Sequence, residues 1–179
     1  MIQNTDLISS KTPLLGFAAY SGTGKTTLLK QLIPLIKESG MRVGVIKHAH
    51  HKVDVDQPGK DSYELRKAGA GRVLLATSQH WALMVDEPHP KEPELPELLQ
   101  RLDCREIDLV VVEGFRHLDF PKIELHRPAL GKPLLFPDDP SVIAVATDAP
   151  IEQQSELPIL DLNDLSEIAK FVEEYCASY

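Results

Sequence analysis

Cysteine and long apolar runs are scarce in this sequence. Its 179 residues include two cysteines, Cys104 and Cys176, which form no C-x-x-C pair and allow at most one disulfide. With no secretory leader pattern, we expect reduced thiols in a cytoplasmic protein. The longest apolar runs have the length of a β-strand, so the sequence predicts no membrane span.

Positive charge is also in short supply. Lysine and arginine total 19 and aspartate and glutamate total 27, which gives a net charge of -8. An acidic surface repels a phosphate backbone, so we expect no nucleic-acid partner. A small anionic ligand stays compatible with this balance, because one local site can be positive on an acidic protein.

What the sequence does contain is an alternation of strand-like and helix-like segments. Residues 107–114 and 141–148 are almost continuously apolar, as strands buried on both faces of a parallel sheet are. Helical spacing of apolar residues marks residues 26–38 and 164–176. We predict an α/β fold with a mostly parallel sheet flanked by helices. A single nucleotide-binding domain over residues 13–179 would follow a flexible tail over residues 1–12.

Two segments are predicted to add short antiparallel pieces. Residues 73–78 and 80–85 (VLLATS and HWALMV) indicate a β-hairpin. Residues 122–127 (KIELHR) alternate polar and apolar side chains with period two, as a half-exposed strand does. Open strand edges of this kind favour a homodimer. The alternative is a monomer that covers its edges with proline-rich links.

The most informative stretch joins the first strand to the first helix. Residues 19–26 (AYSGTGKT) have the spacing of a Walker A phosphate-binding loop, although Ala19 replaces its usual first glycine. Backbone N–H groups and the helix dipole would hold phosphate there, and the lysine would reach the β- and γ-phosphates. The predicted nucleotide contacts are Ser21, Gly22, Thr23, Gly24, Lys25, Thr26 and Thr27.

A phosphate loop of this type needs acidic and hydroxyl ligands for Mg²⁺. Thr26 supplies the hydroxyl, and Glu113 ends the strand IDLVVVEG at the edge that faces the loop. Asp108 lies at the opposite end of that strand and is excluded. Asp61 has two compatible interpretations: it starts the helix SYELRKAGA as an N-cap with Glu64 three residues on, or it completes the metal site.

Three histidines, His48, His50 and His51, follow the second strand in the stretch KHAHHKVDVDQPGKDS. Their spacing matches no familiar zinc pattern. Contact with a substrate or with the metal of the nucleotide is the favoured interpretation, and a separate metal site is the alternative.

Taken in order, FAAYSGTGKTTLLKQLIP, VIKHAHH, DVDQPGKDSYELRKAGA, WALM, LVVVEGFRH and VIAVATD resemble the MobB family of molybdopterin-guanine dinucleotide biosynthesis proteins. The stretches cover most of the chain from residue 14 to residue 150. This family is related to dethiobiotin synthetase. That kinship implies Glu113 and Asp61 as Mg²⁺ ligands and Lys47 as a phosphate-facing lysine.

The resemblance also implies a biochemical role. A MobB-type protein is a homodimer that binds GTP, hydrolyses it weakly and assists the conversion of molybdopterin to molybdopterin guanine dinucleotide. The nucleotidyl transfer belongs to a partner, a MobA-type guanylyltransferase. The alternative is a P-loop small-molecule kinase or ligase-like enzyme related to dethiobiotin synthetase, which would need a positioned general base.

Selection of guanine is weakly encoded. Asp148 follows the strand of residues 141–148, where related P-loop proteins read the base. Its carboxylate could accept hydrogen bonds from guanine, or it could be an ordinary turn residue.

Overall fold

The structure is a computed structural model that describes residues 12–49 and 56–179. The chain divides into two compact units: a larger unit of residues 1–48 and 94–179, and a smaller unit of residues 49–93. The predicted tail of residues 1–12 lies almost wholly outside the described residues. Within the described part of the chain, no helix combines the length and apolar character needed to cross a bilayer.

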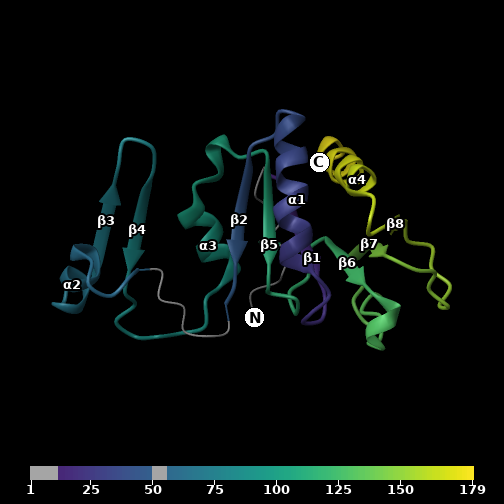
Figure 1. Ribbon diagram of the computed structural model, residues 1–179, viewed down its shortest axis with the longest axis horizontal. Helices are drawn as coiled ribbons and strands as arrows, with labels where there is room; N and C mark the ends of the chain where they lie inside the picture. The colour runs from purple at the N-terminus through teal and green to yellow at the C-terminus, as the bar shows by residue number, and fades with distance from the viewer. Residues whose placement is uncertain (1–11, 50–55) are drawn as a thin grey trace. The chain divides into compact units, whose positions relative to one another are not determined.

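Strands and helices alternate along the larger unit. Its elements are β1 (Leu14–Ala18), α1 (Lys25–Glu38), β2 (Val43–Lys47), α3 (Leu95–Leu102), η2 (Cys104–Glu106), β5 (Leu109–Glu113), β6 (Lys122–His126), η3 (Pro128–Leu130), β7 (Val142–Thr147), β8 (Ile159–Asp161) and α4 (Leu165–Ala177). The strands form one parallel sheet in the order β2-β5-β1-β6-β7-β8 (Figure 1). The predicted mostly parallel α/β fold is confirmed.

Apolar side chains on both faces of this sheet build the core. On one face, buried residues of α1 and α4, among them Leu32 and Val172, pack with Leu15 of β1 and Val111 of β5. On the other face, Leu95 of α3 packs with residues of β1, β2 and β5. Strands covered on both faces need apolar residues at every position, which explains why β1 and β5 are almost continuously apolar.

Strand β6 departs from the sequence-based expectation. It lies between β1 and β7, runs parallel to both, and all five of its residues are buried. The prediction of a half-exposed antiparallel addition at KIELHR is therefore wrong. Lys122 Nζ donates to the Leu118 carbonyl at 2.6 Å, to the Asp139 carboxylate at 3.0 Å and to the Ser141 hydroxyl. Partners from the segments before and after β6 thus compensate the burial of a charge.

Glu124, two residues further along β6, is also a buried charged residue with partners in the following loop. Its two carboxylate oxygens accept the backbone N–H groups of Leu135 at 2.8 Å and Phe136 at 2.9 Å. Burial nevertheless raises the pKa of Glu124, because it disfavours the charged form. Lys122 and Glu124 therefore anchor the loop that follows the strand.

A glycine in β1 makes room for this polar network. A Cβ on Gly16 would lie 2.6 Å from Cε2 of Phe120 and 2.9 Å from Cγ of Lys122. The ammonium of Lys122 lies 4.9 Å from the centroid of the Phe120 ring, a cation–π contact. The aromatic ring therefore occupies the space that a side chain on β1 would fill.

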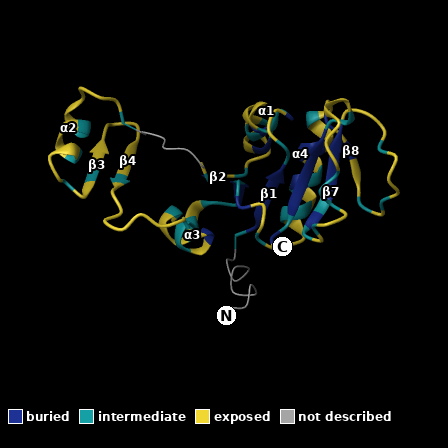
Figure 2. Ribbon diagram, turned by 90° about the horizontal axis from the view of Figure 1, so that it is seen from below, coloured by how far each residue is buried: buried dark blue, intermediate teal, exposed yellow. Residues whose placement is uncertain are grey.

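The smaller unit contains α2 (Asp61–Lys67) and an antiparallel hairpin of β3 (Arg72–Ala76) and β4 (Trp81–Val85), which confirms the predicted hairpin. None of its described residues is buried, whereas the sheet of the larger unit is buried along most of its strands (Figure 2). The predicted cap of α2 is wrong. Lys60 occupies the N-cap position without a side-chain hydrogen bond, and Asp61 is the first helical residue.

Candidate functional site

The loop between β1 and α1 has the backbone shape of an anion-binding site. Gly22 and Gly24 have φ values of 86° and 99°, a left-handed region that glycine occupies without strain. Thr23 is buried and stabilises the turn, because its hydroxyl donates to the Tyr20 carbonyl at 2.9 Å. The first turn of α1 contains no acidic residue, so the positive end of the helix dipole is not neutralised.

Four predicted site residues meet at the carboxyl ends of β2 and β5. Lys47 and Glu113 are register partners on these neighbouring strands, and Lys47 Nζ lies 3.1 Å from Glu113 Oε2. The hydroxyl of Thr26 donates to Glu113 Oε1 at 3.4 Å, and Lys25 Nζ lies 4.0 Å from the same oxygen. One carboxylate, one hydroxyl and two ammonium groups thus surround the start of α1.

This donor set suits Mg²⁺. A hard cation of this size prefers oxygen ligands and is usually held by one or two carboxylates together with waters and the phosphates of its substrate. Thr26 and Glu113 offer such oxygens side by side. Across residues 12–49 and 56–179, no group of three histidine, cysteine or acidic side chains forms a metal site of the protein's own.

The acidic residue just before β5 has a different environment from Glu113. Asp108 immediately precedes the strand and receives hydrogen bonds from Nε and Nη2 of Arg42, each at 3.0 Å. These hydrogen bonds lower the pKa of Asp108 to about 2. Asp108 and Glu113 therefore lie at opposite ends of one strand, as the sequence predicts.

Asp61 and the histidine cluster are only partly located. Asp61 belongs to the smaller unit, so its participation in the metal site stays a prediction. His50 and His51 lie outside the described residues. The ring of His48 stacks on Phe115 with 4.6 Å between centroids. Gly114, whose φ is 107°, makes this possible, because a Cβ there would lie 2.6 Å from the Cβ of His48.

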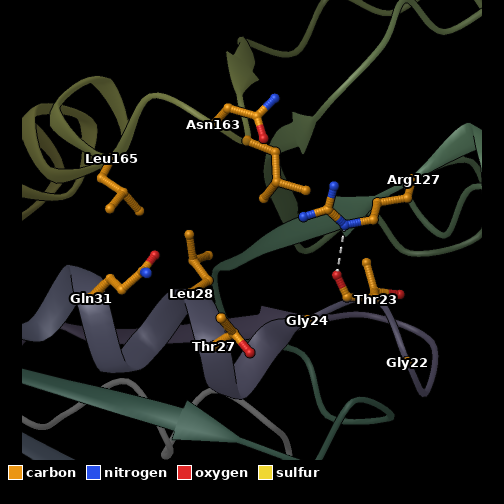
Figure 3. A pocket seen from close by; sticks show the side chains of 10 residues that line it. Gly22, Thr23, Gly24, Thr27, Leu28, Gln31, Arg127, Asn163 and Leu165 are labelled. Atoms are coloured by element: carbon orange, nitrogen blue, oxygen red, sulfur yellow. Dashed lines mark hydrogen bonds between the residues drawn. The ribbon is translucent and has the colours of Figure 1, made fainter.

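One residue near the loop escaped sequence reasoning. Arg127 follows β6 directly, and its Nε donates to the Thr23 carbonyl at 2.9 Å (Figure 3). Its Nη1 forms an ion pair with Asp148, which follows β7. Arg127 therefore connects the phosphate loop to Asp148. Recognising β6 as an interior parallel strand would have placed the residue after it at the same edge as the loop.

A parallel sheet whose first strand leads through a glycine-rich loop into a helix, with a carboxylate at the end of a neighbouring strand, defines a P-loop protein. Within that class, this chain belongs to the MobB family: residues 14–148 match "Molybdopterin guanine dinucleotide synthesis protein B".

Two relatives match the chain over nearly its full length. The "Molybdopterin-guanine dinucleotide biosynthesis adapter protein" of Escherichia coli K12 is 51% identical over 91% of this chain and 93% of its own length. The protein of the same name from Haemophilus influenzae is 45% identical over 98% of this chain and 96% of its own length. A crystal structure of a MobB protein homolog from Bacillus stearothermophilus shares the fold, with a TM-score of 0.69 at 21% identity over 93% of this chain and 99% of that one.

Proposed function

We propose that this chain is an adapter protein in the synthesis of molybdopterin guanine dinucleotide and that it acts with GTP bound at the phosphate loop. The observation that carries the proposal is the 51% and 45% identity to two proteins named as adapters of this biosynthesis, across more than nine tenths of their lengths. The geometry around Glu113 supports a nucleotide as the ligand.

The triphosphate would lie over the N-terminus of α1. Backbone N–H groups of residues 21–27 would donate to its oxygens, and Lys25 and Lys47 would supply positive charge. Both lysines lie at 4.0 Å or less from Glu113. A local excess of two ammonium groups over one carboxylate would allow an anion to bind on a protein with a net charge of -8.

Mg²⁺ would be held by Thr26 and Glu113, and Asp61 stays the third predicted oxygen ligand. The cation would neutralise phosphate charge and orient the β- and γ-phosphates. We expect GTP hydrolysis to be weak at most. Membership of the MobB family favours the adapter over the kinase or ligase-like alternative, which would need a positioned general base at the γ-phosphate.

The partners proposed for this adapter are molybdopterin and a MobA-type guanylyltransferase, which would perform the nucleotidyl transfer in the cytoplasm. The name of the relatives supports this proposal, because it describes an adapter of molybdopterin-guanine dinucleotide biosynthesis.

A homodimer is the proposed assembly, and one face of the hairpin supports it. Leu74 of β3 lies opposite Leu83 of β4, and Ala76 lies opposite Trp81, so these side chains share one face. Within the described residues that face is uncovered: Leu74, Leu83 and Trp81 are 63%, 52% and 70% exposed. Contiguous apolar surface of this kind marks protein contacts. Strand β6 takes no part, because it is an interior strand.

Calorimetric titration tests the nucleotide proposal. GTP, ATP and molybdopterin are each titrated into the full chain with and without Mg²⁺. GTP should bind more tightly than ATP, and Mg²⁺ should tighten both. Absence of GTP binding under every condition would contradict the proposal. Sedimentation equilibrium at micromolar concentration tests the dimer, and a single species near 19.9 kDa would remove it.

A further inference from the structure

The two residues that follow Glu113 both have left-handed backbone. Gly114 has a φ of 107°, and Phe115 has a φ of 51°. Within residues 12–49 and 56–179, Phe115 and Asp103 are the only non-glycine residues with a positive φ. This conformation is strained for an aromatic residue and persists only where surrounding contacts outweigh the strain. Glycine would adopt it freely, so the strain is explained by a contact that only the side chain of Phe115 can make.

His48 makes that contact. Its ring stacks on Phe115 with 4.6 Å between centroids and an angle of 22° between the ring planes. Phe115 is 3% exposed and belongs to the core cluster on the α3 face of the sheet, together with Ile46 and Val112. The Phe115 carbonyl accepts the N–H of Leu118 at 2.9 Å, and Leu118 packs against the same cluster. Packing therefore holds the backbone after β5 in one conformation.

His48 lies close to each of the three residues from Glu113 to Phe115. Its backbone N–H donates to the Glu113 carbonyl at 2.8 Å, one residue beyond the register pair of Lys47 and Glu113. At Gly114 the two segments are so close that a Cβ would lie 2.6 Å from the Cβ of His48. At Phe115 the two rings stack. A hydrogen bond, a close approach and a stack thus fix the backbone that carries the Glu113 side chain.

The Glu113 side chain is the part of this segment that meets the start of α1. Its oxygens lie 3.4 Å from Thr26 Oγ1 and 3.1 Å from Lys47 Nζ. A carboxylate that ligates a metal needs a fixed backbone, because a small displacement of the ligand weakens coordination. Residues behind metal ligands commonly supply this support, and their loss lowers metal affinity by about 10–100-fold. His48 and Phe115 have this place behind Glu113.

We propose that His48 and Phe115 are positioning residues for the Glu113 carboxylate, which they hold through the backbone of residues 113–115. The inference rests on the proposed binding of GTP with Mg²⁺ and adds two residues that set how tightly the metal binds. It gives the His48 ring a role in stacking and not in metal ligation. The left-handed backbone of Phe115 is then the conformation that brings its ring against His48.

The test measures the Mg²⁺ requirement, which is the Mg²⁺ concentration that gives half of the metal-dependent tightening of GTP binding. GTP is titrated calorimetrically into the full chain at a series of Mg²⁺ concentrations and in EDTA. His48→Ala removes the ring but keeps the backbone N–H, and His48 is only half-buried, so the fold tolerates the change. The Mg²⁺ requirement should rise at least about tenfold. GTP affinity in EDTA should stay unchanged, because the loop after β1 holds the phosphates.

His48→Phe is the rescue variant. It restores an aromatic ring against Phe115 but no imidazole nitrogen, so the Mg²⁺ requirement should return to the parental value. Phe115→Leu keeps a buried apolar side chain without a ring and should match His48→Ala. The double variant should have no larger effect than either single one, because both substitutions remove the same contact. His89→Ala, at an exposed histidine between β4 and α3, is the control and should behave like the parent.

A parent that binds no GTP, or binds it equally with and without Mg²⁺, would contradict the proposed nucleotide site and this inference together. With a parent that responds to Mg²⁺, three results would overturn the positioning role alone. One is an unchanged Mg²⁺ requirement in His48→Ala. Another is a requirement that stays raised in His48→Phe, which would make the imidazole itself a metal ligand. The third is an equal loss of GTP affinity with Mg²⁺ and in EDTA, together with a lower thermal unfolding midpoint, which would show a purely structural role.

Discussion

The larger and smaller units place their apolar residues in opposite ways. In the larger unit, β5 buries its four apolar residues completely between two layers of helices. In the smaller unit, β4 carries Trp81 and Leu83 at 70% and 52% exposure, and α2 carries Leu65 at 59%. The same kinds of side chain thus form a core in one unit and an uncovered surface in the other. A core fixes the geometry of a ligand site, whereas an uncovered apolar surface is suited to assembly.

Lys25→Ala tests whether the larger unit binds the ligand independently of assembly. Lys25 is the first residue of α1, its ammonium lies 4.0 Å from Glu113 Oε1, and it is not part of the hydrophobic core cluster. Affinity for GTP should fall by about 100-fold or more, while the dimer and the thermal unfolding midpoint stay unchanged. Titration calorimetry measures the affinity, and Lys30→Ala, on the exposed side of the same helix, is the control. Parental GTP affinity in Lys25→Ala would remove the phosphate-loop assignment.

Trp81→Asp tests whether the hairpin of the smaller unit forms the dimer contact. A carboxylate at the most exposed apolar position of the hairpin would have to be desolvated on assembly, so the dissociation constant of the proposed dimer should rise by about 100-fold. Sedimentation equilibrium measures it, and GTP affinity should not change. Gln79→Asp places the same charge in the turn of the hairpin and should leave the dimer intact. A dimer of parental strength in Trp81→Asp would move the contact elsewhere.

Lys122→Met tests how much the buried polar network of β6 stabilises the larger unit. The substitution keeps the volume of the side chain but leaves Asp139 and the Leu118 carbonyl without their donor, so the free energy of unfolding should fall by about 2–3 kcal/mol. Denaturant titration measures the loss. Arg42→Met breaks an exposed ion pair at β2 and should barely move the midpoint. Equal effects of the two variants would show that the buried network is not specially stabilising.

The smallest effect is expected for Glu113→Gln, which removes a charge but keeps a side chain of similar shape. Mg²⁺-dependent tightening of GTP binding and Mg²⁺-dependent hydrolysis should weaken by about tenfold, while GTP affinity without metal is retained. Asp108→Asn, at the other end of the same strand, is the control. Unchanged metal dependence in Glu113→Gln would direct the search to Asp61.

Local sequence patterns predict many of the strands and helices of this fold. Continuous apolar runs predict β5 and β7 because strands covered on both faces tolerate little else. The end of the chain is equally regular, since Asp164 accepts the N–H groups of Ser166 and Glu167 and starts α4 where the sequence places it. The glycine-rich loop is a local motif, so its nucleotide contacts can be predicted from residue spacing alone, and they stay predictions.

What could not be predicted depends on distant partners. Period-two alternation in β6 suggested exposure, but the polar side chains are buried because a proline-rich loop brings Asp139, Ser141 and the N–H groups of Leu135 and Phe136 to them. No local pattern reveals such pairing. Arg127 was missed for the same reason, since its position beside the phosphate loop follows from the place of β6 in the sheet.

The contact between Gly16 and Phe120 has a consequence for how this sequence can change over time. The ring fills the space that a side chain on Gly16 would need, and it also carries the ammonium of Lys122 on its face. A larger residue at position 16 therefore requires a smaller one at position 120. Loss of the ring would remove the cation–π contact of Lys122. Position 16 lies far from positions 120 and 122 in the chain, yet the three are expected to be inherited and replaced together, as one evolutionary unit.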